Sequence, residues 1–243
     1  MLSWDNMQLR RETAQRIRAF LDEWFPPVLR DARWFMRSLF VIFYGPLAND
    51  FLDFKQRAVN MTPQDFAAFY AKIADAPPHR ASHLTDASLD RIVREAANAT
   101  SMLDVGAGKG FLIKKLAAAN PTAEAVACDV HIEQTDLSGS NIHAVQAPIE
   151  HLPFQDKSFD VVTCTHTLEH VMDLPIALAE LRRITARKLV VVVPKQRPYR
   201  YTFDPHVQFF PYRISIATSF GTPMGSVVCE EISGDWFYTE TRA

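Results

Sequence analysis

The stretch MLDVGAGKGF at residues 102–111 places three glycines at every second position, directly after a short apolar run and an aspartate. The chain has only 8 glycines in 243 residues. Glycine loses more backbone entropy on folding than any other residue, so a cluster of glycines indicates backbone at positive φ or a ligand against the main chain. The aspartate is Asp104, and the glycines are Gly106, Gly108 and Gly110.

Short apolar runs alternate with helical patterns from about residue 86 to the end of the sequence. This alternation is typical of an α/β fold, here a Rossmann-like, mostly parallel sheet with an antiparallel hairpin at its C-terminal edge. The expected strands are 101–106, 124–130, 141–146, 158–164, 188–194, 225–233 and 235–241, and the expected helices are 86–98, 110–120, a short one after Asp129, and 173–184. The glycines therefore follow the first strand, and open α/β sheets bind ligands at the carboxyl ends of their strands.

The first 85 residues lack this alternation and look helical instead. The stretch RRETAQRIRAFLDEWF at 10–25 has the mixed charges of a helix, and Thr62 followed by Pro63 predicts a helix start. We therefore expect two domains, a helical N-terminal cap over 1–85 and the sheet domain over 86–243.

The composition, with 48% hydrophobic and 22% charged residues, is that of an ordinary globular protein. The net charge of −2 gives no basic excess, so nucleic acid is not an expected partner. Cys128, Cys164 and Cys229 lie in apolar runs, which fits reduced core thiols better than disulfides or a metal site. The longest apolar run, Leu39 to Tyr44, is too short to cross a bilayer, and the N-terminus lacks an apolar signal core. We therefore expect a cytoplasmic location.

The glycine pattern differs from the fingerprint of nicotinamide dinucleotide sites. That fingerprint, G-x-G-x-x-G, needs glycine or alanine at position 111, where this chain has Phe111, while Gly110 comes one position early. The difference argues against a pyrophosphate cradle and against an NAD-dependent oxidoreductase.

The pattern D-x-G-x-G-x-G resembles the first motif of class I S-adenosylmethionine-dependent methyltransferases, and the resemblance extends over roughly residues 86 to 243. In that family, bare main chain of the glycine loop lies against the methionine and ribose parts of the cofactor. The resemblance implies S-adenosyl-L-methionine as cofactor, held at Gly106, Gly108 and Gly110. It also implies that the carboxylate of Asp104 orients the cationic end of the cofactor.

A second carboxylate closes the second expected strand. Asp129 lies 19 positions after Gly110, close to the spacing at which an acidic residue binds ribose hydroxyls in such folds. A carboxylate that accepts two hydroxyl protons forms charge-assisted hydrogen bonds and fixes the orientation of the sugar. Val130 would then lie against one face of the adenine.

The segment QAPIEHLPF at 146–154 resembles the adenine-contacting loop of the subgroup that includes small-molecule and quinone methyltransferases. That subgroup usually has an acidic residue and a small residue where this chain has Pro148 and Ile149. A proline offers no side-chain acceptor and no amide donor. The adenine contacts are therefore expected from the Ile149 backbone, Glu150 or Gln146.

The segment SFDVVTCTHTLEHVMD at 158–173 resembles the fourth strand and following turn of the same subgroup. The resemblance places Thr165 and His166 near the methionine end of the cofactor. No N-P-P-[YFW] tetrapeptide follows this strand, so the amino-methylating site built on that tetrapeptide is not expected.

Methyl transfer from a sulfonium is an in-line displacement, and positioning of the acceptor can supply much of the acceleration. An oxygen or nitrogen acceptor that loses a proton would need a general base, and histidine suits that role near neutral pH. His166 and His206 are the candidates. For His206, in the loop after the fifth strand, a packing or capping role stays open. His170 is expected to satisfy local polar groups at a helix start.

Aromatic residues interleaved with arginines mark the segment 24–45. In similar enzymes such N-terminal helices cover the cofactor and help form the acceptor pocket. Three roles are open for these aromatics: walls of an acceptor pocket, packing in a core, or shallow docking at a membrane surface. The residues concerned are Trp34, Phe35, Phe40, Phe43 and Tyr44.

The resemblance implies a methyltransferase that acts on a small or lipid-linked metabolite by in-line methyl transfer. Two alternatives from other classes stay open. One is a cofactor-binding or scaffold protein that keeps the fold without turnover, which the departure at Pro148 and Ile149 would suit. The other is the NAD-dependent oxidoreductase that Phe111 disfavours. The sequence does not indicate an oligomeric state.

Overall fold

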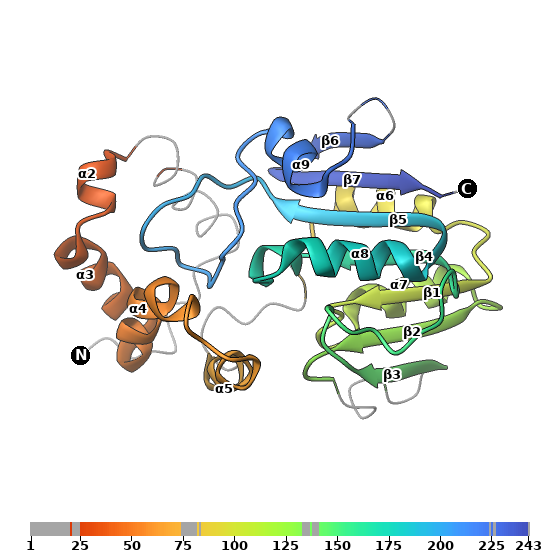
Figure 1. Ribbon diagram of the computed structural model, residues 1–243, viewed down its shortest axis with the longest axis horizontal. Coiled ribbons are helices and arrows are strands. Elements are labelled where there is room, and N and C mark those ends of the chain that lie inside the picture. The colour runs from red at the N-terminus through yellow and green to blue at the C-terminus, as the bar shows by residue number, and fades with distance from the viewer. Residues whose placement is uncertain are drawn as a thin grey trace. The chain divides into compact units, whose positions relative to one another are not determined.

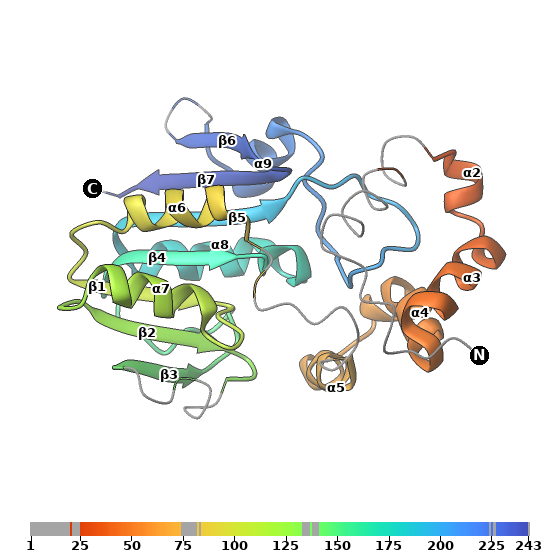
Figure 2. The same ribbon diagram turned by 180° about the vertical axis from the view of Figure 1, so that it is seen from behind.

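The computed structural model describes most of the chain, and Figures 1 and 2 show it from opposite sides. The described residues are 20, 25–73, 82, 84–132, 137, 141–223, 225 and 227–242. Among them, no helix has both the length and the apolar character needed to cross a membrane. Most of the helix expected over 10–25, and most of the segment after Asp129, lie outside the described residues.

The chain forms two compact units. The sheet unit contains Ala81–Lys195 and Gln208–Ala243, and the helical unit contains Met1–Arg80 and Gln196–Val207. The sequence-based division assigned every residue after 85 to the sheet domain. The segment Gln196–Val207 departs from that expectation because its aromatic side chains pack among the N-terminal helices.

The sheet unit is built on a seven-stranded sheet with the order β3-β2-β1-β4-β5-β7-β6 (Figure 1). Its strands are β1 (Ser101–Val105), β2 (Glu124–Asp129), β3 (Ile142–Gln146), β4 (Phe159–Thr165), β5 (Thr185–Pro194), β6 (Val228–Ile232) and β7 (Asp235–Thr241). The first five strands run parallel, whereas β7 pairs antiparallel with β5 and β6 pairs antiparallel with β7. The predicted α/β fold and its antiparallel edge hairpin are confirmed.

Helices cover both faces of this sheet. The described helices of the unit are α6 (Asp86–Glu95), α7 (Phe111–Ala119), α8 (Leu174–Ile184) and α9 (Arg213–Phe220). Helices α6 and α7 lie on one face (Figure 2), and α8 and α9 lie on the other (Figure 1). Successive strand residues point to opposite faces, so Met102 packs on the α7 side and Leu103 on the α8 side. The buried run Val190–Val193 in β5 fits a strand covered on both faces.

One helix of the sheet unit was predicted from its sequence and another was not. Helix α8 begins where its cap predicts, because the Asp173 carboxylate accepts a hydrogen bond from the backbone N–H of Ile176 at 3.2 Å. Helix α9 was not expected. It buries only Ile216 and Phe220, so its apolar stripe is too short to stand out in the sequence.

The helical unit packs its described helices around aromatic side chains. They are α2 (Pro27–Arg30), α3 (Arg33–Tyr44), the 3-10 helix η2 (Gly45–Leu47), α4 (Ala48–Ala58) and α5 (Pro63–Ile73). The Tyr44 ring stacks on Phe51 with centroids 4.0 Å apart, and its hydroxyl donates to the backbone carbonyl of Phe203 at 2.6 Å. Phe40 packs edge-on against Phe203, with centroids 4.9 Å apart. For Phe40 and Tyr44 the structure therefore shows core packing.

The start of α5 agrees with its sequence signal. The Thr62 hydroxyl accepts from the backbone N–H of Asp65 at 3.2 Å, and the Asp65 carboxylate accepts from the Thr62 N–H at 2.9 Å. This reciprocal pair is a capping box, and it satisfies backbone donors that the first helical turn cannot.

Candidate functional site

The strand order reverses at β1, which lies between β2 and β4. In open α/β sheets this switch point leaves a crevice at the carboxyl ends of the strands, where ligands bind. The segment that follows β1 is Gly106–Gly110, the glycine loop. The topology thus places the loop at the position where a ligand is expected.

The three glycines of the loop all have positive φ angles, but they meet different surroundings. A Cβ atom on Gly106 would lie 2.0 Å from the Thr167 hydroxyl oxygen, and one on Gly110 would lie 2.3 Å from a Leu137 methyl carbon. At Gly108, no atom of the described residues, apart from the glycine and its chain neighbours, lies within 4 Å of the corresponding position. Packing therefore favours glycine at 106, where a Cβ would meet the whole Thr167 side chain, whereas at 110 only the end of the Leu137 side chain would have to shift. The bare main chain at Gly108 meets no side chain of the described residues.

The carboxylate of Asp129 is fixed at the tip of β2 by two backbone donors. One oxygen accepts from the Gly108 N–H at 2.9 Å, and the other accepts from the His131 N–H at 3.0 Å. A carboxylate has about four lone-pair sites, so acceptor capacity remains for ligand hydroxyls. The structure thus brings Gly108 and Asp129, two predicted cofactor residues, into direct contact.

The residues expected to contact adenine differ in their exposure. Val130 follows Asp129 and is 45% exposed, and its carbonyl accepts from the Gln146 side-chain amide at 2.9 Å. Ile149 is buried and packs into the apolar core, so only its backbone could meet a ligand. Glu150 is partly exposed and Pro148 is exposed. Contacts of these residues with adenine stay predictions.

Asp104 lies in β1, directly before the glycine loop, and is buried. One carboxylate oxygen accepts from the Thr163 hydroxyl at 2.7 Å on the neighbouring β4. Burial raises the pKa of Asp104 to about 7 against the opposing effect of the Thr163 bond, and the negative charge of Asp129 adds to the rise. The two carboxylates together would favour a bound cation, which would lower this pKa again.

His166 follows β4 with a φ of 51° and donates its backbone N–H to the Val192 carbonyl at 2.8 Å. Its ring lies between two carboxylates, with Nδ1 3.4 Å from Glu169 Oε1 and Nε2 3.4 Å from Asp235 Oδ2. Burial lowers the pKa of His166, but Asp235 and Glu169 outweigh it and raise the pKa to about 10. An imidazole that is already protonated at neutral pH has no lone pair to accept a proton. These surroundings favour a fixed cation over a general base.

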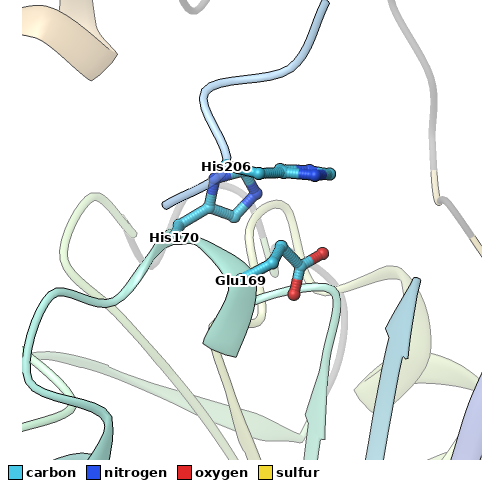
Figure 3. A group of neighbouring side chains, drawn as sticks. All are labelled: Glu169, His170 and His206. Atoms are coloured by element: carbon cyan, nitrogen blue, oxygen red, sulfur yellow. The ribbon is translucent and has the colours of Figure 1, made fainter. Parts of the chain in front are cut away.

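The turn after β4 is shaped by its own polar groups. The Thr167 hydroxyl donates to the carbonyl of Thr165, the partly exposed last residue of β4, at 3.1 Å. The 3-10 helix η4 (Leu168–His170) follows, and the Glu169 carbonyl accepts from the Gln208 N–H at 3.0 Å. Figure 3 shows the Glu169 and His170 side chains on this short helix. The Leu-Glu-His triplet thus forms a single turn.

His206 belongs to the helical unit, on the segment Gln196–Val207, and its ring is drawn in Figure 3. Its side chain is buried, and Nδ1 lies 2.6 Å from the side-chain oxygen of Gln196. Asp204 is near on the same segment, with a carboxylate oxygen 4.0 Å from Nε2 and a backbone carbonyl that accepts from the His206 N–H at 2.7 Å. Sequence reasoning missed Gln196, because a neutral amide in a polar loop carries no spacing signal.

Residues 103–192 match the family described as a methyltransferase domain. The sheet unit contains a class I S-adenosylmethionine-dependent methyltransferase domain. S-adenosylmethionine is the cofactor that defines this class. The matched residues run from β1 to β5 and include the glycine loop, Asp129 and the turn after β4. The sequence-based assignment to this class is confirmed.

Two curated relatives show the range of acceptors among similar methyltransferases. A ubiquinone/menaquinone biosynthesis C-methyltransferase, UbiE, from Hahella chejuensis is 35% identical over 94 residues, which cover 35% of this chain and 38% of that protein. A malonyl-[acyl-carrier protein] O-methyltransferase from Geobacter sulfurreducens is 31% identical over 127 residues, covering 49% of this chain and 48% of that protein. This chain therefore spans half or less of the length of either relative.

A solved structure shares the fold more broadly. The 1,6-didemethyltoxoflavin-N1-methyltransferase of Burkholderia thailandensis, with 1,6-didemethyltoxoflavin and S-adenosylhomocysteine bound, matches with a TM-score of 0.54. The match covers 74% of this chain and 86% of that chain at 16% sequence identity. At this identity the likeness shows a common fold.

Proposed function

We propose that this chain transfers the methyl group of S-adenosylmethionine to a small or lipid-linked metabolite. The observation that carries the proposal is the glycine loop, where the open main chain of Gly108 donates its N–H to the fixed carboxylate of Asp129. The two curated relatives are named for quinone biosynthesis and for a malonyl group on an acyl-carrier protein. Their names support an acceptor of the small or lipid-linked class.

The cofactor residues have distinct proposed roles. The main chain at Gly108 contacts the cofactor, and Asp129 accepts from its ribose hydroxyls. Asp104 provides negative charge below the loop for the cationic end. When bound, S-adenosylmethionine supplies an electrophilic methyl group on a sulfonium. The remaining proposed contacts are Gly106, Gly110, Val130, Ile149, Glu150 and Thr165.

His206 is the proposed general base, and His166 now has a different proposed role. The ring of His166 is held as a cation between Glu169 and Asp235. His206 instead meets a neutral amide, Gln196, at Nδ1. We therefore assign proton acceptance to His206, and to His166 the task of holding the turn after β4 in place.

Calorimetric titration tests the cofactor assignment. Binding of S-adenosylmethionine and S-adenosylhomocysteine without binding of NAD is the expected result, and the reverse would overturn it. The variant Gly108→Ala should weaken binding by about tenfold, because a methyl group enters the space left for the ligand. Gly221→Ala is the matched control, since Gly221 also has a positive φ and open space around it. Both variants place alanine at a positive φ, so a selective loss at Gly108 identifies the site.

Turnover requires a second experiment. Labelled S-adenosylmethionine incubated with fractionated cell extract should pass its methyl group to an extractable metabolite. The variant Asp129→Asn should abolish that transfer. A chain that binds the cofactor tightly but labels nothing in any fraction would favour the inactive scaffold alternative.

Peripheral contact of the helical unit with an anionic bilayer belongs to the same proposal. One face of α3 is exposed and carries Trp34, Val41 and Ile42, at spacings that place them on one side of the helix. Arg37 is exposed on the same face, and α3 contains no acidic residue. Aromatic and aliphatic side chains beside arginine suit the boundary of an anionic membrane.

Vesicle sedimentation tests this contact. The chain should sediment with vesicles of phosphatidylglycerol and phosphatidylcholine, and the double variant Trp34→Ser, Ile42→Ser should reduce the bound fraction severalfold. Ile214→Ser is the matched control, since Ile214 is 64% exposed on α9 of the sheet unit. Equal binding by all variants, or none by the parent chain, would exclude the contact, and self-association lost in the double variant would assign the face to a second copy.

A further inference from the structure

Gln196 and His206 form a closely defined pair at the two ends of one segment of the helical unit. Only 3% of Gln196 and 4% of His206 is exposed, and the amide oxygen lies 2.6 Å from Nδ1 of the ring. An amide oxygen accepts hydrogen bonds and cannot donate one. The contact therefore requires that Nδ1 of His206 carries the hydrogen.

The orientation of the Gln196 amide is supported from its other end. Its nitrogen donates to the Tyr199 hydroxyl at 3.4 Å. Tyr199 is itself held in place, because the Arg30 guanidinium lies 4.9 Å from the centre of its ring and the Lys55 ammonium donates to its backbone carbonyl. With the nitrogen directed to Tyr199, the amide oxygen is directed to His206.

We propose that Gln196 is a positioning residue that holds neutral His206 in the Nδ1–H tautomer, so that Nε2 bears the lone pair that accepts a proton. The inference rests on the proposed role of His206 as general base. When an acceptor hydroxyl or amine is deprotonated, its proton would bond to Nε2 and the acceptor would keep the electron pair that bonds the methyl carbon, while the methyl–sulfur bond breaks and its electrons stay on sulfur. The carboxylate of Asp204, 4.0 Å from Nε2, stabilises the resulting positive charge. Water then takes up the proton.

The tautomer can be read directly, without an acceptor. Long-range nitrogen-proton correlation spectra of the full chain, labelled with ring ¹⁵N-histidine, distinguish a protonated Nδ1 from a protonated Nε2. The variant His206→Asn identifies the His206 signals among those of the 8 histidines. At pH 9, we expect the parent chain to show the Nδ1–H pattern. An Nε2–H pattern in the parent chain would overturn the proposal.

Variants of Gln196 separate positioning from folding. Gln196→Met keeps the length of the side chain and removes the acceptor, so the Nδ1–H population should fall at least severalfold. Gln196→Glu keeps an acceptor, so Nδ1 should stay protonated, and the added negative charge beside Asp204 should also increase the share of the doubly protonated ring. Gln208→Met is the control, because the Gln208 amide donates to the backbone carbonyl of Val171 and not to an imidazole. An unchanged tautomer in Gln196→Met would contradict the inference.

The outcome is distinguishable from failure of the proposed function. If methyl transfer is never observed but His206 shows the Nδ1–H pattern and loses it in Gln196→Met, the pairing stands and the catalytic role does not. If methyl transfer is observed but the tautomer of His206 is the same in Gln196→Met as in the parent chain, the function stands and the positioning role is wrong. Retained affinity for S-adenosylmethionine in Gln196→Met would show that the sheet unit is intact.

Discussion

The sheet unit and the helical unit hold their candidate site residues by different physical means. In the sheet unit, backbone geometry and charge dominate: Gly108 bonds Asp129, and His166 lies between two carboxylates. In the helical unit, aromatic packing dominates, and the segment that carries His206 is anchored through Phe203. His166 is held protonated by two carboxylates, each 3.4 Å from a ring nitrogen, while His206 has an amide oxygen at 2.6 Å and one carboxylate oxygen at 4.0 Å. The partner of the ring, more than its burial, decides what it can do.

Removal of the aromatic anchor should give the largest effect. Phe203→Ala deletes a buried ring that packs on Phe40 and Phe43, at centroid distances of 4.9 and 5.3 Å. Such a truncation typically costs about 3 to 5 kcal/mol of unfolding free energy. We expect a loss of that size in denaturant titration and unchanged affinity for S-adenosylmethionine in calorimetry. Weaker cofactor binding of the folded variant would break the division of roles between the two units.

The charged clamp on His166 should give the next effect. At pH 7.5, His166→Gln should lower the unfolding free energy by about 3 kcal/mol, because it leaves two buried carboxylates without their cation. The pKa of His166 is raised to about 10 from an ordinary 6.5. The stabilisation is therefore complete below pH 6.5 and is lost as the pH rises through about 10. Denaturant titrations between pH 6 and 10 should show this decline in the parent chain and a flatter profile in the variant.

A parallel titration of His131→Gln provides the control, since His131 is exposed and its ring is not part of the clamp. If the parent chain and His166→Gln lost stability in parallel across this range, the clamp would not be the cause. The contrast between a charged His166 and a proton-accepting His206 would then lose its basis.

The candidate site residues of the sheet unit could be predicted from the sequence because their motifs are local. The glycine loop follows a strand, and Asp129 ends the next one, so strand order alone brings them together. Glu169 lies only three residues after His166, but its contact with the ring was not predicted. Asp235 was not, because it reaches His166 through pairing of β7 with β5, where Asp235 lies opposite Pro194.

The helical unit shows the opposite case. Thr62 followed by Pro63 predicted the start of α5, and mixed charges predicted a helix over 10–25. No local signal showed that Tyr201 and Phe203 would be buried against α3, more than 150 positions earlier in the chain. Aromatic residues in a loop fit many partners, and only the tertiary structure selects one. The pairing of Gln196 with His206 escaped prediction for the same reason.

Substitution of Gly106 in the glycine loop should have a smaller effect on stability, and it can separate the cost of a steric clash from the cost of backbone strain. Gly106→Ala places a Cβ 2.0 Å from the Thr167 hydroxyl at a φ of 74°. Positive φ alone costs a non-glycine residue roughly 1 to 2 kcal/mol, and the clash adds to it. The double variant Gly106→Ala, Thr167→Gly should relieve the clash and regain the stability lost to it, while the cost of the positive φ remains. If thermal unfolding showed that the double variant loses as much stability as the two single variants together, the contact with Thr167 would not be the reason for glycine at this position.

The smallest expected effect concerns the charge below the glycine loop, and it sharpens the comparison with His166. Burial raises the pKa of Asp104 to about 7, so below that pH the side chain becomes neutral in the free protein. A cationic ligand favours the carboxylate, so its affinity should rise with pH up to about 7, by at most about tenfold per pH unit, and then level off. Calorimetry with S-adenosylmethionine between pH 5.5 and 8.5 measures this slope, and Asp104→Asn should remove it while Thr163→Val should move the midpoint upward. A flat profile in the parent chain would mean that Asp104 does not exchange a proton when the cation binds.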